Sequence, residues 1–315
     1  PGGLLNESVD IVNLFVEKGE EVVSTKGKIK SWEKSYIANK QPLDTDIPLV
    51  VLINSSSASA SEIVSGAIQD LDRGVVIGQR SYGKGLVQQT RKLSYNAQLK
   101  LTVAKYYIPS GRCIQALDYS NRNEDGSVGK ISDSLMAAFQ TKNGREVFDG
   151  GGINPDIITE TGKVSNIVIS LFRERFFFDY ATDFRFKNDR ITENFVFSDD
   201  DYQHFVNYLS DKEYTYKTKT EEALEKVKKK AIDENYFDSF SDEYESLLAK
   251  LESNKGDDLF TNKQEVKEII SGEIASRYFY QEGRIKSALN FDLEIKKAIE
   301  VLQDKEGYNK ILQIK

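Results

Sequence analysis

The apolar run at residues 47–54, "IPLVVLIN", limits most narrowly what this chain can fold into. A continuous run rich in β-branched residues is typical of a strand that is buried on both faces of a parallel sheet. Apolar residues at helical spacing follow at 60–71, and a second short apolar run, "GVVIG", occupies 74–78. A strand, a helix and a strand in this order indicate a crossover connection, so we predict an α/β fold.

Three further segments belong to the predicted core or its surface. Apolar residues at helical spacing over 4–19 predict a helix that ends at a glycine. The segments 86–93 and 97–108 have the composition of a β-hairpin joined by a short turn. The polar stretch 118–130 lacks periodicity, and we interpret about 117–149 as a surface insertion.

The composition changes after Val164, where Gly and Pro become rare and Lys, Glu, Asp, Tyr and Phe dominate. Amphipathic helical spacing recurs through this part, and Ser198 before three aspartates is a good helix N-cap. We therefore predict two modules, an α/β core over 1–162 and a mostly α-helical C-terminal module over 163–315. The Lys and Glu runs of the second module are interpreted as solvated helix faces, with a partner-binding surface as the alternative.

The charge and the metal-binding residue types exclude several classes of function. The net charge is −7 and no dense basic patch is present, so nucleic acid is not expected as a partner. The only cysteine is Cys113 and the only histidine is His204, which excludes an intrachain disulfide, a thiolate cluster and a histidine zinc site. We expect no metal and no cofactor. We interpret Cys113 as a small residue beside a strand and His204 as a helix-surface residue.

Five serines occur within the seven residues 55–61, in the stretch "NSSSASASEI" that follows the first buried strand. They lie at a turn from a strand into a helix, where the first helical N–H groups have no intrahelical partner. A serine nucleophile at such a turn is exposed, and the next N–H group can serve as an oxyanion donor. The alternative for Ser59 is structural, because Ser59 to Glu62 also fits a capping box. The box alone does not separate the two roles.

A lysine between two glycines, Lys84 in "SYGKGLVQQ", follows Ser59 by twenty-five positions. With a single histidine in the chain, lysine is the better candidate for the base of a serine nucleophile. An ordinary lysine has a pKa near 10.4, so a lysine base needs burial among apolar neighbours to be neutral. Gln88 shares the strand face of Lys84 and can orient its amine. The alternative is an exposed hairpin lysine.

These motifs together resemble the C-terminal processing, or tail-specific, peptidases, which are serine proteases with a Ser/Lys dyad. The resemblance extends over residues 1 to about 161, with the motifs in matching order. Besides the serine and lysine segments, it rests on the opening "PGGLL", on "YYIPSGRCIQ" at 106–115 and on "GGGINPDI" at 150–157. The resemblance implies a crotonase/Clp-protease-like stacked βα core, N-terminally incomplete, followed by the helical module.

Asp70 lies eleven residues beyond Ser59, about three helical turns along the axis. We therefore interpret it as a structural acid that holds the turn before Arg73.

The resemblance also implies roles for individual residues. Ser59 would be the nucleophile, Lys84 its general base and Gln88 the residue that orients the lysine. The oxyanion donors would be the N–H of Ala60 and the N–H of a glycine in the opening turn, either Gly2 or Gly3.

Location and partners follow from the same resemblance. The family acts on exported proteins, so a bacterial periplasmic or cell-envelope location is implied. The substrates would be proteins or peptides with accessible C-terminal tails, no metal or cofactor is implied, and assembly into a homo-oligomer stays open. Family members usually carry a PDZ domain ahead of the core. This chain opens on "PGGLLNES", which is typical of a domain interior, so we expect a fragment.

The main prediction is therefore a serine endopeptidase that cleaves proteins near their C-termini. Two alternatives from other functional classes stay open. One is a non-catalytic peptide-binding or scaffold protein on the same fold, which the presence of Ser59, Lys84 and Gln88 disfavours. The other is a crotonase-like acyl-CoA enzyme, which shares the stacked βα architecture but needs no lysine opposite a serine.

Overall fold

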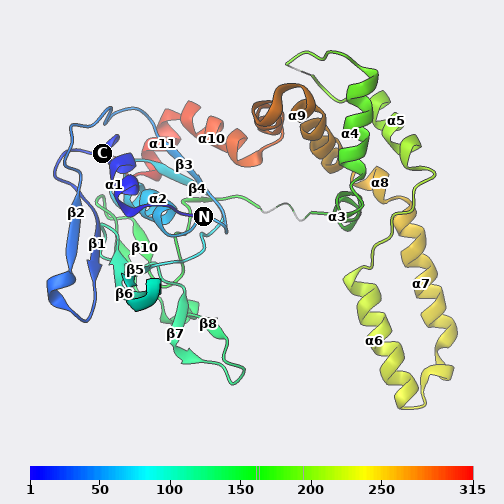
Figure 1. The fold of residues 1–315 in the computed structure, drawn as a ribbon, viewed down its shortest axis with the longest axis horizontal. Helices are drawn as coiled ribbons and strands as arrows, with labels where there is room; N and C mark the ends of the chain where they lie inside the picture. Colours follow the sequence, from blue (N-terminus) through cyan, green and yellow to red (C-terminus); the bar gives the residue numbers. More distant parts are fainter. Residues whose placement is uncertain (161, 163, 194, 315) are drawn as a thin grey trace. The chain divides into compact units, whose positions relative to one another are not determined.

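The structure is a computed structural model that describes residues 1–160, 162, 164–193 and 195–314 (Figure 1). It divides into two compact units, one of Pro1–Thr161 with Leu293–Lys315 and the other of Gly162–Asp292. An α/β core and a mostly helical second part agree with the predicted fold class. The predicted boundary between 162 and 163 adjoins Thr161 and Lys163, which lie outside the described residues.

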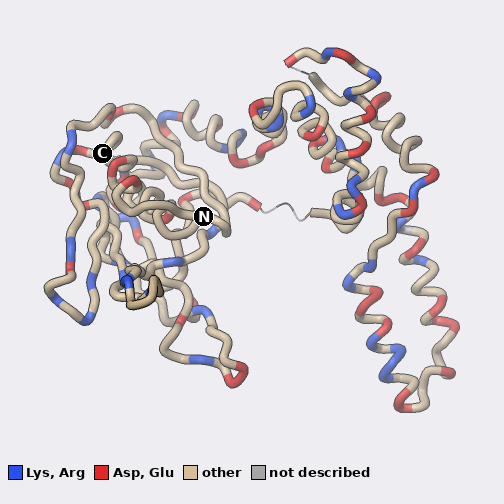
Figure 2. Tube along the Cα trace, in the orientation of Figure 1, with Lys and Arg blue, Asp and Glu red and all other residues tan. Residues whose placement is uncertain are grey.

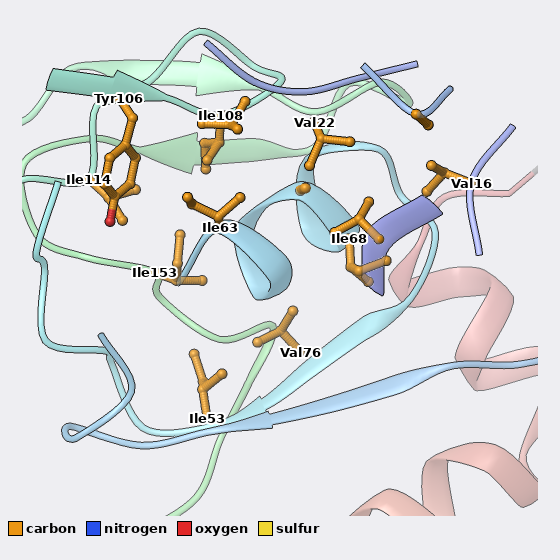
Figure 3. Packing of buried hydrophobic residues seen from close by; sticks show 14 residues of the cluster. Val16, Val22, Ile53, Ile63, Ile68, Val76, Tyr106, Ile108, Ile114 and Ile153 are labelled. Atoms are coloured by element: carbon orange, nitrogen blue, oxygen red, sulfur yellow. The ribbon is translucent and has the colours of Figure 1, made fainter. Parts of the chain in front are cut away.

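A β-α-β arrangement forms the centre of the first unit, as the two apolar runs predict. Strands β3 (Val50–Ile53), β4 (Val75–Gly78) and β11 (Ile157–Ile158) pair in parallel in the order β11-β4-β3. Helix α2 (Ala60–Asp70) connects β3 to β4. Its apolar face joins the main hydrophobic core, which Figure 3 shows around Ile63 and Ile68.

Strand β4 is buried on both faces because different helices cover its two sides. Val76 belongs to the core cluster that includes α2. Val75 and Ile77 pack instead with residues of α10 (Leu293–Gln303) and α11 (Lys305–Ile311). Successive side chains of a strand point to opposite faces, so this alternation explains why the whole run is apolar.

The last two helices therefore belong to the first unit, whereas the sequence analysis assigned them to the C-terminal helical module. The Leu49 N–H donates to the Tyr308 hydroxyl at 2.9 Å, and the Asn143 amide donates to the Leu312 carbonyl at 2.7 Å. These bonds tie α11 to the core. Amphipathic spacing identifies a helix, but it does not reveal which surface covers the apolar face.

The same unit contains a four-stranded antiparallel sheet in the order β2-β1-β6-β5. Strands β5 (Leu86–Lys92) and β6 (Gln98–Tyr107) form the predicted hairpin. Strands β1 (Glu21–Lys26) and β2 (Lys34–Ile37) are additional to the sequence prediction. Because β6 pairs with β1 on one side and β5 on the other, β5 is an edge strand of this sheet within the described residues.

Helix α1 (Leu5–Asn13) is shorter than the predicted helix, which was expected to end at Gly19. The Asn13 side-chain amide donates to the Lys40 carbonyl at 2.8 Å, and its oxygen accepts from the Lys40 N–H at 2.7 Å. This two-point contact anchors the end of the helix to a distant segment, which spacing along the sequence does not show.

The predicted surface insertion is more regular than its sequence suggests. It contains two small antiparallel hairpins, β7 (Leu117–Arg122) with β8 (Val128–Lys130), and β9 (Ala138–Gln140) with β10 (Glu146–Phe148). Among the described strands, each hairpin forms a separate two-stranded sheet. Neither hairpin therefore needs the alternation of apolar and polar residues that is typical of a strand packed against a hydrophobic core.

The second unit is helical, as predicted, and its core is rich in aromatic rings. Phe205 lies 5.7 Å from Phe177 and 5.0 Å from Tyr180 between ring centroids. The Ser198 hydroxyl caps α5 by accepting from the Asp201 N–H, as predicted, and His204 is exposed on that helix. The helices are α3 (Asn166–Arg173), α4 (Phe176–Lys187), α5 (Asp199–Leu209), α6 (Lys219–Asp233), α7 (Ser241–Gly256), α8 (Asp258–Thr261) and α9 (Lys263–Leu289).

Short 3-10 turns occur at Lys30–Trp32, Ser94–Asn96, Asp133–Leu135 and Phe237–Ser239. The second of these closes the hairpin of β5 and β6 at the predicted turn. Among the helices of the described ranges, none combines the length and the apolar character that a membrane span requires.

Candidate active site

Ser59 has an unusual backbone conformation at the turn from β3 into α2. Its φ and ψ angles are 58° and −118°. Ser198 and Thr218 also begin capping boxes, but their backbones have the ordinary extended conformation. The φ and ψ angles are −72° and 175° at Ser198, and −80° and 155° at Thr218. A non-glycine residue in such a conformation costs about 1–3 kcal/mol, and strain of this kind gathers at functional sites. Capping therefore explains Ser198 and Thr218, but it does not explain the strain at Ser59.

A fully buried carboxylate, Glu62, connects the serine turn to the lysine loop. One oxygen accepts from the Ser59 N–H at 2.8 Å and from the Lys84 N–H at 2.9 Å. The other accepts from the Ser81 hydroxyl at 2.5 Å and from the Gly83 N–H at 2.7 Å. The sequence analysis considered Glu62 only as a capping partner of Ser59. In the structure it also fixes the loop that carries Lys84.

Lys84 is exposed, contrary to the expectation that a lysine base would be buried among apolar neighbours. Its backbone is fixed by Glu62, and the nearby Tyr82 N–H donates to the Ser57 carbonyl at 2.9 Å. No hydrogen bond or ion pair holds the Lys84 amine within the described residues. The main chain of the lysine loop is thus rigidly joined to the serine turn, while the amine remains open to a cleft.

The cleft has a volume of about 510 Å³ and is lined by both predicted lysine-site residues, Lys84 and Gln88. Leu86 lies between them and lines it as well, so side chains at every second position face the same space, as expected for an extended segment. The serine turn contributes Ser55, Ser56 and Ala58. The predicted grouping of Lys84 with Gln88 on one face is therefore present.

Tyr106, at the end of β6, is a site residue that the sequence analysis did not identify. Its side chain is 2% exposed and lies in the main core (Figure 3). Its hydroxyl donates to the Lys84 carbonyl oxygen. Burial raises the pKa of Tyr106 well above its usual range, the Glu62 charge adds to this, and a hydrogen bond with the Ser59 side chain opposes it. Tyr106 is thus a buried neutral phenol that is hydrogen-bonded to the backbone of Lys84.

The opening Pro-Gly-Gly turn lies against the serine turn through Gly2. A side-chain carbon placed at Gly2 would be 2.9 Å from the Ala58 carbonyl oxygen and 3.0 Å from the Ser59 Cβ. Gly2 also has a φ of 114°, which favours glycine. The equivalent carbon at Gly3 has no neighbour within 4 Å. Ala60 begins α2, and its N–H has no acceptor in the part of the chain that the structure describes.

Asp70 is a structural acid, as predicted, but its partner differs from the predicted one. Its carboxylate accepts from Arg112 at 2.7 Å and from the Ser110 N–H at 3.0 Å. The side chains of Asp70 and Arg112 are 0% and 1% exposed. Asp70 therefore holds the segment after β6 and not the turn before Arg73. Cys113 in this segment is half-buried, and burial raises the pKa of its thiol.

Replacing Asp70 by asparagine is expected to lower the free energy of unfolding by about 3–5 kcal/mol, because Arg112 would remain as a buried charge without its partner. Denaturant unfolding of the purified protein measures this loss. The control is Asp10→Asn, which removes a surface ion pair with Lys40 whose partners are 46% and 62% exposed. That change should cost at most about 1 kcal/mol. Equal losses in the two variants would contradict the structural role of Asp70.

Two protein-family models match the chain, and they match different parts of it. Residues 1–120 match the model of peptidase family S41. Residues 167–302 match the model described as the C-terminal helical domain of probable PDZ-proteases. The first match contains every residue of the candidate site described above, and the second covers most of the helical unit.

Curated relatives are similar to the same N-terminal part. A carboxy-terminal-processing protease of Bartonella bacilliformis is 46% identical over 117 residues, which is 37% of this chain and 27% of that protein. A carboxyl-terminal-processing protease of Picosynechococcus is 46% identical over 109 residues, or 35% of this chain and 26% of that protein. The chloroplastic carboxyl-terminal-processing peptidase 1 of Arabidopsis thaliana is 38% identical over 109 residues, which is 35% of this chain and 22% of that protein. The chain thus spans about a quarter of the length of these relatives.

Solved structures with similarity include a photosystem II D1 C-terminal processing protease, at 28% identity and a TM-score of 0.37, covering 50% of this chain and 32% of that one. A putative S41 protease from Bacteroides fragilis has 12% identity and a TM-score of 0.34, and the match covers 50% of this chain and 35% of that chain. The similarity to the family rests on the sequence matches and not on these low structural scores. Residues 1–120 are thus similar to peptidase family S41, both by the family model and by the curated relatives.

Proposed function

We propose that this protein is a serine endopeptidase that cleaves protein substrates near their C-termini, with Ser59 as nucleophile and Lys84 as general base. The observation that carries the proposal is the strained backbone of Ser59 together with its attachment to Lys84. Both backbone N–H groups donate to the same Glu62 oxygen, at 2.8 and 2.9 Å. A residue that only capped α2 would need neither the strain nor this link.

In the proposed reaction the Ser59 hydroxyl oxygen attacks the scissile carbonyl carbon, and the neutral Lys84 amine takes the hydroxyl proton. The negative oxygen of the tetrahedral intermediate is stabilised by the Ala60 N–H and by a glycine N–H of the Pro-Gly-Gly turn, Gly2 or Gly3. The lysine then donates its proton to the leaving amine, and an ester of Ser59 remains. Water hydrolyses this ester with the same lysine as base.

Lys84 must be neutral to act as a base, yet its side chain is exposed. A polypeptide that fills the cleft would cover the amine between Tyr82, Leu86 and its own apolar groups. Removal of water disfavours the charged ammonium form, so substrate binding would itself promote the neutral base. Gln88, which lines the same cleft, would orient the amine toward Ser59.

The cleft adjoins an edge strand, which favours an extended polypeptide as substrate. Strand β5 begins at Leu86, and its free edge offers backbone donors and acceptors to a further strand. We propose substrates with accessible C-terminal tails in the bacterial periplasm or cell envelope, by analogy with relatives named carboxy-terminal-processing proteases. No metal or cofactor takes part in the proposed reaction, and assembly into a homo-oligomer is compatible with it.

Labelling by a fluorophosphonate tests the proposal, since this reagent reacts with activated serines. Mass spectrometry of the digested protein should locate the adduct on Ser59 and on none of the neighbouring serines. A scaffold protein or an acyl-CoA enzyme on this fold has no activated serine and would remain unlabelled. Absence of an adduct on Ser59 in a folded protein that also fails to cleave an unstructured substrate would refute the proposed function.

Chelators are expected to leave hydrolysis unchanged, because the proposed reaction uses only protein groups. The measurement is the rate of cleavage of an unstructured protein before and after dialysis against EDTA. Loss of activity that added zinc restores would contradict a metal-free Ser/Lys mechanism.

A further inference from the structure

The hairpin of β7 and β8 contributes one wall of the candidate active-site cleft, although its sequence is that of a polar surface insertion. Leu117 and Tyr119 both line the cleft that contains Lys84. They are two positions apart on β7, so their side chains share one face of the strand, and Asp118 between them faces the other way. The two apolar groups are therefore directed toward the same space as the lysine amine.

The base of this hairpin is fixed directly to the two residues that flank Lys84. The Ala116 N–H donates to the Gly83 carbonyl at 2.9 Å, and the Gly85 N–H donates to the Gln115 side chain at 2.8 Å. A Cβ atom at Gly83 would lie 2.3 Å from the Ala116 Cβ, and a Cβ atom at Gly85 would lie 2.8 Å from the backbone nitrogen of Gln115. The flanking glycines thus allow the hairpin to approach closely, which fixes its distance from Lys84.

Beyond this base the hairpin projects from the core and changes character. Figure 1 shows β7 and β8 extending away from the three-stranded and four-stranded sheets of the unit. Figure 2 shows acidic residues at the tip, where the sequence has Glu124 and Asp125 between the strands. A charged, hydrated tip does not offer an apolar surface. Only the base, with Leu117 and Tyr119, presents one.

The composition of the cleft indicates which substrate side chain would fit against this wall. Around the amine, the apolar groups come from Leu86 and Tyr82 on the lysine loop and from Leu117 and Tyr119 on the hairpin. Tyr82 and Tyr119 are 49% and 50% exposed. An apolar side chain inserted between these groups would remove apolar surface from water at about 25 cal/mol per Å². A charged or amide side chain placed against the side chains of Leu117 and Tyr119 would be desolvated, because these two side chains offer the apolar surface of the hairpin wall.

We propose that Leu117 and Tyr119 are specificity-determining residues, which select a bulky apolar side chain of the polypeptide close to the scissile bond. This inference rests on the proposed peptidase function. The hairpin does not take part in the bond-making steps. It sets which sequences are cut, because its apolar wall faces the lysine at a distance fixed by Gln115 and Ala116.

The experiment uses the full-length protein and two variants, Leu117→Asn and Tyr119→Ala. Digestion of unstructured β-casein, followed by mass spectrometry, first identifies the position next to the cleavage site at which apolar residues are enriched. Two peptides that differ only by Leu or Asn at that position are then compared by kcat/KM. For the wild type we expect a preference for Leu of about 10-fold or more. In both variants this preference should fall to within about 3-fold of unity, while hydrolysis of the Asn peptide is retained.

The control is Tyr95→Ala, because Tyr95 is a tyrosine at the turn of another hairpin, is more exposed than Tyr119 (102% against 50%), and does not line the cleft. It should keep the wild-type preference. Wild-type hydrolysis with the same Leu preference in Leu117→Asn and Tyr119→Ala would overturn this inference and leave the peptidase function standing. Absence of hydrolysis by the wild type would overturn the proposed function, and this inference with it.

Discussion

Replacing Ser59 by alanine is expected to lower kcat/KM for peptide hydrolysis by about 10⁴-fold or more, while the protein remains folded. The loss follows because no other group would form the ester intermediate. Ser59→Gly should be equally inactive but more stable than Ser59→Ala by about 1–2 kcal/mol, since glycine tolerates the φ of 58°. Steady-state kinetics and denaturant unfolding of the two variants measure both effects. Stability that does not differ between them would contradict the strain at this turn.

The same loss of activity is expected for Lys84→Ala and for Lys84→Arg, because an arginine keeps the positive charge but cannot serve as a base near neutral pH. The double variant with Ser59→Ala should be no worse than either single variant, as residues that act as a unit are not additive. The control is Lys92→Ala, which removes another exposed lysine at the far end of β5 and should leave hydrolysis unchanged. Substantial activity in Lys84→Arg would exclude the lysine as general base.

Replacing Glu62 by alanine is expected to lower both the stability of the protein and its activity, because Glu62 supports the fold and the site together. Four donors would lose their acceptor: the N–H groups of Ser59, Gly83 and Lys84, and the Ser81 hydroxyl. Each buried donor left unsatisfied costs about 1–3 kcal/mol. We expect the free energy of unfolding to fall by about 3 kcal/mol or more, and kcat/KM to fall by about 10²-fold or more.

Glu62→Gln keeps the shape of the side chain and separates these effects from simple loss of packing. An amide presents an NH₂ group where one carboxylate oxygen now accepts two hydrogen bonds, so activity should still fall sharply. The control is Glu221→Gln in the helical unit, another buried capping-box glutamate, which bonds Lys255 and the Thr218 N–H. This Glu221→Gln substitution should leave the rate of peptide hydrolysis unchanged. Wild-type turnover by Glu62→Gln would show that the link between the serine and lysine segments is dispensable.

Patterns within a few residues of each other predicted the centre of the fold correctly. The run 47–54, the helical spacing of 60–71 and the run 74–78 correspond to β3, α2 and β4. Each of these elements buries a continuous face, so its period is visible in the sequence. The β5–β6 hairpin was predicted from two strand-like segments around a short turn, although most of its residues are exposed.

Contacts between distant segments were not predictable in this way. Glu62 lies three residues from Ser59 and reads as a capping partner, but three of its four bonds reach Ser81, Gly83 and Lys84, about twenty positions away. Tyr106 contacts Lys84 only because β6 returns beside the lysine loop. Such bonds are created by the fold and leave no period in the sequence.

Two differences between the sequence prediction and the structure have the same physical origin. The helices α10 and α11 were assigned to the helical module, yet they cover Val75 and Ile77 on the far side of β4. The hairpin β7–β8 was interpreted as an irregular insertion, yet it lines the cleft. In both cases the sequence shows what a segment can form, while its partner surface lies elsewhere in the chain. The exposure of Lys84 is a third difference, because apolar neighbours in sequence do not guarantee burial.

The rate at which a fluorophosphonate phosphonylates Ser59, measured against pH in the wild type and in Lys84→Ala, tests the Ser59–Lys84 pairing most directly. Because a neutral amine is the base, the wild-type rate should rise with pH and reach a plateau once the lysine is deprotonated. In Lys84→Ala the rate should be lower by about 10²-fold or more at the plateau and should lose this rise. The same rate and the same pH profile in both proteins would contradict the account, because Ser59 would then be activated without the lysine.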